Sequence, residues 1–184
     1  NFIKCTSAKF LLEAVDTTKQ ISPLFDNLGN LHFSISTKNK RAQAFFDQGL
    51  KLSYAFNHAE AHRSFMEASR LDPDAAMTYW GQAFTLGPNI NDPLPLEERK
   101  IKINEALARA QQLSSKSSLK EQALIAALSA RYSEDLTEDI AKLNMNYMHA
   151  MAKTIEKFPN DAHIQILYAA SVMNTVPWNY WDSD

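Results

Sequence analysis

The sequence predicts an all-α protein, and three features of its composition support that class. Only 4 of the 184 residues are glycine, whereas an average usage of ~7% would give about 13. Alanine (24 residues) and leucine (19) dominate, and valine occurs three times. Alanine and leucine favour helices, while strand-rich folds need turn glycines and β-branched residues. The composition therefore argues against a sandwich, a barrel or a Rossmann sheet, and we expect about eight helices.

Bulk composition also limits the function. Hydrophobic residues make up 45% and charged residues 22% of the chain, and the formal net charge is −2. Because positive and negative charges nearly cancel, we expect no basic surface of the kind that binds nucleic acids. No apolar run approaches the ~18 residues of a membrane span. The single cysteine, Cys5, cannot form an internal disulfide or a thiolate-rich metal site. No cofactor is expected.

The first 36 residues are expected to form a helix and an extended segment that pack on the helices after them. A cap at Ser7 and an apolar stripe predict a helix over 7–18. In the irregular stretch 21–36, Leu31, Phe33 and Ile35 alternate with polar residues. A period of two predicts an extended, half-buried segment, which we expect to lie across helices.

Seven further helices are predicted from capping residues and apolar spacing. Ser118 with Glu121, and Asn57 with Glu60, have the spacing of capping boxes. Asp74, Thr137 and Asp161 also have side chains suited to N-caps, and Pro95 suits a first turn. The predicted bounds are 39–55, 57–71, 74–87, 95–113, 118–132, 137–158 and 161–174. Two tryptophans close to Asp184 suggest that the chain continues beyond it.

Two of these helices carry a repeat-like spacing of aromatic and small residues. The positions expected to pack the helices together are Phe45, Gly49, Leu52, Ala61, Phe65, Ala68 and Pro73, followed in register by Tyr79 and Ala83. This spacing resembles the tetratricopeptide repeat, although Gln48 departs from the usual leucine. The resemblance implies a right-handed α-solenoid of antiparallel helix pairs. It divides 37–184 into a clear repeat (37–74), a repeat with a loop insertion at 87–95 (75–114), a degenerate repeat (115–160) and the start of a further, truncated one (161–184).

A narrower resemblance rests on several short strings. They are Asn-Leu-Gly at 27–29, His-Phe-Ser-Ile-Ser-Thr at 32–37, Phe-Asp-Gln-Gly-Leu at 46–50, Phe-Asn-His-Ala-Glu-Ala at 56–61, Tyr-Trp-Gly at 79–81 and Leu-Gly-Pro-Asn-Ile-Asn at 86–91. Together they resemble a group of large bacterial tetratricopeptide proteins of unassigned function. The resemblance implies a bacterial source and further repeats, and it implies no activity. The compartment stays open between the cytoplasm and export to the periplasm with a leader removed.

In a tetratricopeptide array the first helix of each pair lines the concave face. Here that face is expected to show Gln43, Phe46, Leu50, Ser53, Met77, Trp80 and Phe84. The functional hypothesis is a groove for a segment of a partner protein, which makes the chain an interaction scaffold and not an enzyme. The alternative is that Leu31, Phe33 and Ile35, or the 87–95 loop, cover the face internally, because so much exposed aromatic surface is unfavourable. Phe46 and Leu50 replace the lysine and asparagine of carboxylate-clamping members, so that subtype is not expected.

Two histidines provide a competing hypothesis. His58 and His62 are four residues apart on one helical face and could share a metal ion, with His32, His149 or His163 as a third ligand. A metal-binding protein or metal-dependent enzyme is therefore one alternative. If neither histidine binds a metal, we expect His58 to pack against the fold and His62 to be exposed. A third possibility is a purely structural part of a longer multi-repeat protein.

Gly81 lies inside a predicted helix, where glycine is unfavourable by ~1 kcal/mol, so we expect close backbone contact there.

Overall fold

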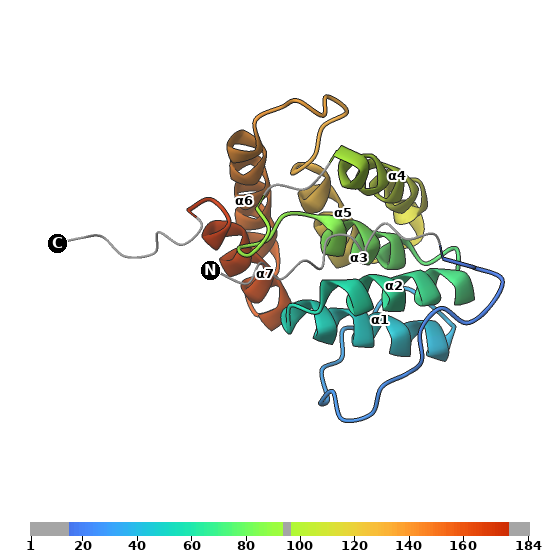
Figure 1. The fold of residues 1–184 in the computed structure, drawn as a ribbon. Helices are drawn as coiled ribbons and strands as arrows, with labels where there is room; N and C mark the ends of the chain where they lie inside the picture. The colour runs from blue at the N-terminus through green and yellow to red at the C-terminus, as the bar shows by residue number, and fades with distance from the viewer. Residues whose placement is uncertain (1–14, 94–96, 177–184) are drawn as a thin grey trace, which may run out of the picture.

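The computed structural model describes residues 15–93 and 97–176, and this part of the chain confirms the all-α class (Figure 1). Its seven α-helices are α1 (Lys40–Tyr54), α2 (His58–Leu71), α3 (Ala76–Leu86), α4 (Glu97–Leu113), α5 (Leu119–Ser129), α6 (Ile140–Lys157) and α7 (Ala162–Met173), with a 3₁₀ turn, η2 (Ser114–Lys116), between α4 and α5. None of the helices in this described part is long and apolar enough to cross a membrane.

The helix predicted over 7–18 falls mostly outside the described residues. Its last four positions, 15–18, are described and are not helical. Asp16 instead accepts a hydrogen bond from the backbone nitrogen of Thr18 at 3.0 Å. The prediction that this helix reaches Thr18 is therefore wrong, because the side chain of Asp16 closes a local turn there.

Three of the predicted N-caps are present. Asn57 accepts a hydrogen bond from the backbone nitrogen of Glu60 at the start of α2, and Asn39, for which no capping role was predicted, accepts from two backbone nitrogens at the start of α1. Ser118 and Glu121 form a complete capping box at α5. Asp161 accepts from the first turn of α7. These side chains satisfy donors that a helix start otherwise leaves unpaired.

Three capping predictions are wrong, and each has a local reason. Ala75 and not Asp74 precedes α3, without a side-chain cap. The hydroxyl of Thr137 donates to Asp135 at 2.7 Å, and Asp139 caps α6. The side chain of Glu60 pairs with Arg63, so the second half of the box at Asn57 is not formed.

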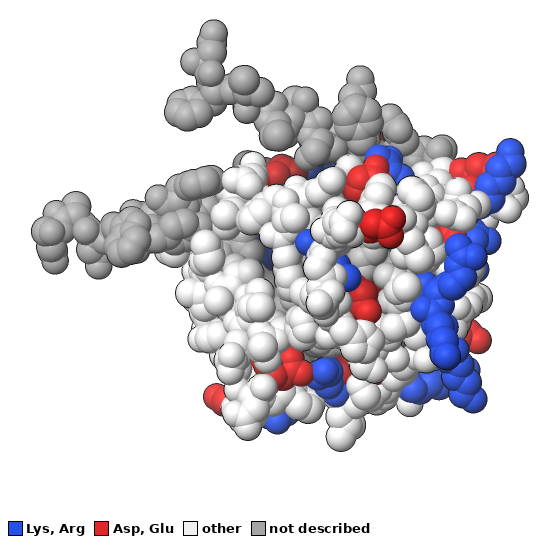
Figure 2. Space-filling view, turned by 90° about the horizontal axis from the view of Figure 1, so that it is seen from below, with Lys and Arg blue, Asp and Glu red and all other residues white. Residues whose placement is uncertain are grey.

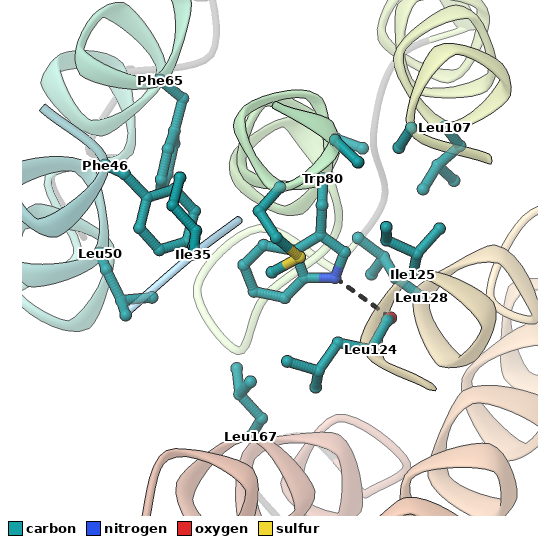
Figure 3. Packing of buried hydrophobic residues seen from close by; sticks show 14 of the residues in the cluster. Ile35, Phe46, Leu50, Phe65, Trp80, Leu107, Leu124, Ile125, Leu128 and Leu167 are labelled. Carbon is teal, nitrogen blue, oxygen red and sulfur yellow. Dashed lines mark hydrogen bonds between the residues drawn. The ribbon is translucent and has the colours of Figure 1, made fainter. Parts of the chain in front are cut away.

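The helices pack mostly in chain order, α1 on α2, α2 on α3, α3 on α4, α5 on α6 and α6 on α7 (Figure 1). Their apolar faces share one core, and Trp80 lies at its centre. The indole nitrogen of Trp80 donates to the carbonyl of Leu124 at 3.2 Å. Leu124 of α5 and Leu167 of α7 approach the same ring (Figure 3). Consecutive helices and the distant α7 therefore meet at one residue.

The residues proposed to pack the repeat together occupy a range of environments. Phe45, Ala61, Phe65, Ala68 and Ala83 are fully buried. Gly49 and Leu52 are also buried, Tyr79 is half-buried, and Pro73 is exposed beyond the end of α2.

The extended segment before α1 lies across the helices as expected. Phe33 and Ile35 are buried, while the polar residues between and beside them are exposed. Gln43 of α1 holds this segment from both sides, donating to the carbonyl of Phe33 at 2.9 Å and accepting from the nitrogen of Ile35 at 3.0 Å. Asp47 accepts from the nitrogen of Phe33 at 3.0 Å. The side chains of α1 thus replace a partner strand.

Candidate functional site

Most of the predicted concave face is packed inside the protein. Phe46, Leu50, Met77 and Trp80 are at most 2% exposed. They surround a space that is too small for a water molecule, closed by Phe33 and by Leu167 among others. Gln43 is engaged with the extended segment, as described above. The N-terminal segment and α7 therefore cover this part of the face.

Ser53 and Phe84, the other two residues of that predicted face, line an open cavity of about 330 Å³. We call it the α7 cavity, because α7 forms one wall. The other walls come from the C-terminal ends of α1 and α3, the segments that follow α1, α3 and α5, the start of α2, and one residue of α6. Its lining is mainly apolar and includes Phe56, Phe84, Ile90, Ile166, Leu167 and Met173. The ring of Phe84 stacks on Trp80 at 5.0 Å, so the cavity wall is fixed to the core.

Arg131 is the one residue with a permanent charge among those that line this cavity. It follows the last turn of α5 and is 1% exposed. Its Nε donates to Oδ1 of Asn144 at 3.0 Å, and its guanidinium lies over the ring of Tyr147 at 5.0 Å. The guanidinium also lies beside the hydroxyl of Tyr132, its Nη2 is enclosed by the protein, and none of the ion pairs within the described residues includes Arg131.

The side chains around Arg131 are themselves held in place. Asn144 donates to the backbone carbonyl of Asn174 at 3.2 Å, which ties α6 to the end of α7. Tyr147 is 2% exposed, and burial raises the pKa of its hydroxyl to about 12. Arg131 therefore sits on a rigid support of neutral groups, and no described carboxylate balances its charge.

His58 also lines the α7 cavity. Both of its ring nitrogens are buried and have no partner within the described residues. Burial, together with the positive charge of Arg99, lowers the pKa of His58. The imidazole is therefore neutral near pH 7.

His62 lines a different cavity from His58. It lines a second cavity of about 290 Å³ next to Arg63, Lys102 and Glu105. Its Nδ1 is 3.1 Å from the hydroxyl of Thr85. His62 is buried, and the expectation that it is exposed is wrong because α3 packs over it through Thr85. The described residues contain no group of three or more His, Cys, Asp or Glu side chains that could hold a metal.

No local feature of the sequence identifies Arg131 as a candidate site residue. A single arginine directly after a helix usually extends into solvent, and burial here results from the packing of α6 and α7 around it.

Comparison of the chain with protein-family models, curated proteins and solved structures finds no match.

Proposed function

We propose that this chain is a tetratricopeptide-like interaction domain, and that a partner protein contacts the mouth of the α7 cavity rather than the packed centre of the face. The observation that carries the proposal is the position of Phe56. This residue lies in the turn between α1 and α2, lines the cavity, and is 50% exposed. A large aromatic side chain at the edge of an apolar cavity is typical of a binding hot spot.

The backbone at Phe56 strengthens this argument. Its φ is +59°, in the left-handed region that favours glycine. Phe56 donates to the carbonyl of Ser53 at 3.1 Å and Asn57 donates to that of Leu52 at 2.9 Å, which is a Schellman motif with phenylalanine where glycine is usual. Folding alone does not favour this choice, and strained positions of this kind concentrate at functional sites.

The surface beside the cavity mouth also suits a protein partner. α7 contains no Asp, Glu, Lys or Arg, and it leaves Ile166, Val172 and Met173 exposed by 48%, 38% and 38%. In Figure 2 the side of the molecule on which α7 lies carries few charged side chains, whereas basic side chains gather along the opposite edge. An apolar patch of this kind favours protein–protein contact.

Affinity capture with matched variants tests this proposal. Partners retained by the wild-type chain from an extract of the source organism are identified, purified and titrated against wild type, Phe56→Gly and Phe25→Ala. Phe25 is 41% exposed on the N-terminal segment and serves as the control. We expect Phe56→Gly to weaken binding at least about tenfold and Phe25→Ala to leave it unchanged. Equal binding by Phe56→Gly would contradict the proposal.

A second candidate is structural, and the exposed face of α7 favours it. An uncharged helix with exposed Ile166, Val172 and Met173 also suits packing against another helix of a longer array. Oxidative footprinting of Met173 distinguishes the two candidates. Protection of Met173 in a longer natural form of the protein without any partner would favour the structural role, whereas protection only after a partner is added would favour the interaction domain.

A further inference from the structure

We propose that the α7 cavity binds a small monocarboxylic acid, with the carboxylate paired to Arg131 and the hydrocarbon part against the apolar wall. This inference goes beyond the binding of a partner protein at the cavity mouth and does not depend on it.

Two arginines in this chain are buried to the same extent, and only Arg99 has a carboxylate partner among the residues that the structure describes. Arg99 and Arg131 are each 1% exposed. Arg99 pairs with the carboxylate of Asp92 and donates to the backbone carbonyl of Leu86 through Nε at 2.9 Å and Nη2 at 2.7 Å. A buried charge is tolerated when it is paired and hydrogen-bonded, and Arg99 shows the arrangement that folding alone requires.

Arg131 has only part of that arrangement. Its Nε is satisfied by Asn144, one face of the guanidinium packs on the ring of Tyr147, and the hydroxyl of Tyr132 lies beside it. No described carboxylate pairs with it. These contacts fix the orientation of the group without neutralising its charge. The complement of a fixed guanidinium that lines an apolar cavity without a described counter-charge is an anionic acceptor, and carboxylates match guanidinium geometry well.

The rest of the cavity indicates the size and polarity of the ligand. A volume of about 330 Å³ is at the small end of the range for organic ligands. Phe84, Ile166, Met173 and their neighbours supply an apolar wall, and the described lining contains no Asp, Glu or Lys. One fixed positive charge suits one negative charge, and the remaining apolar wall suits an alkyl or aromatic body.

Titration calorimetry with octanoate tests the inference on the wild-type chain, and octan-1-ol and octylamine serve as probes that match its chain length. We expect octanoate to bind one to one, octan-1-ol at least about tenfold more weakly, and octylamine not at all. In Arg131→Gln we expect octanoate binding to fall at least about tenfold, and in Arg131→Lys to be partly retained. Arg109→Gln, in a different cavity wall, should bind octanoate like the wild type. A tenfold change corresponds to about 1.4 kcal/mol.

Several results would overturn the inference. The first is the absence of octanoate binding to the folded wild-type chain up to about 10 mM, which is beyond any specific affinity. The second is equal binding of octan-1-ol and octanoate, which needs no mutant and therefore does not depend on whether Arg131→Gln folds. The third is tighter binding of a short peptide with a C-terminal leucine carboxylate than of octanoate, which would assign the cavity to the chain end of a protein instead of a free acid.

Discussion

The ring of Phe65 in α2 packs directly on Gly81 in α3, with no space for a side chain between them. A Cβ added at Gly81 would lie 2.5 Å from both Cε1 and Cγ of Phe65, and one added at Gly49 in α1 would lie 2.8 Å from Cε1 of the same ring. One aromatic side chain therefore separates two helices that can approach it only through glycine. This contact confirms the expectation that Gly81 marks a close approach of the backbone.

The first prediction concerns Gly81→Ala. In an open helix this change stabilises by about 1 kcal/mol, but here the new methyl group overlaps a fully buried ring. We expect a net loss of about 1–3 kcal/mol in the free energy of unfolding, measured by chemical denaturation. Combining it with Phe65→Leu should recover part of the loss relative to the sum of the single changes. A variant more stable than the wild type would show that Phe65 moves aside freely.

The second prediction concerns pH. Burial lowers the pKa of His62 to about 4, whereas the unfolded chain has a value near 6.5. The unfolded state therefore binds more protons between these values, and stability falls as the pH drops from about 6.5 to about 4, by as much as ~3 kcal/mol. Denaturant unfolding across this range measures the slope. His62→Gln should flatten it, and the same change at exposed His149 should leave it intact; an unchanged slope in His62→Gln would refute the assignment.

The third prediction separates stability from binding at Phe56. Glycine relieves the left-handed backbone, so Phe56→Gly should raise the free energy of unfolding by about 1 kcal/mol while weakening partner binding. Thermal unfolding and the titrations described above give the two readouts. A loss of stability in Phe56→Gly would mean that the ring contributes to folding, and the main argument for a binding role would then fail.

The fourth prediction compares the two buried arginines. Replacing a charge that lacks a partner with an apolar side chain of similar length is often neutral or stabilising, so Arg131→Met should lose less than about 1 kcal/mol. Arg99→Met removes the partner of Asp92 and two donors to Leu86, and it should lose about 3 kcal/mol or more. Urea unfolding of both variants measures the difference. Equal losses would show that Arg131 is as integral to the fold as Arg99.

The fold could be predicted from sequence where local chemistry decides it. Asn57, Ser118 and Asp161 cap helices because their side chains reach backbone nitrogens two or three residues away, and residue types at this spacing can be recognised in the sequence. The choice between Thr137 and Asp139 could not be predicted, since it depends on the turn that Asp135 forms with Thr137.

The candidate site was less predictable because it depends on contacts between distant segments. The apolar spacing of Phe46 and Trp80 indicates a face that must be covered, but not that Leu167, far along the chain, covers it. Arg131 shares no motif with Asn144 or Tyr147, and its burial follows from how α6 and α7 pack beside α5. Periodicity therefore identified the apolar face, and the tertiary structure determined which part of it stays open.

The most direct test of the central claim, that the α7 cavity is a binding site centred on Arg131, is a crystal structure of the chain with octanoate. We predict density for the acid inside the cavity, with a carboxylate oxygen within about 3.2 Å of a terminal guanidinium nitrogen of Arg131 and the alkyl chain against Phe84 and Ile166. Octanoate bound elsewhere, or a cavity that holds only water while Arg131 turns to a protein carboxylate, would contradict the claim.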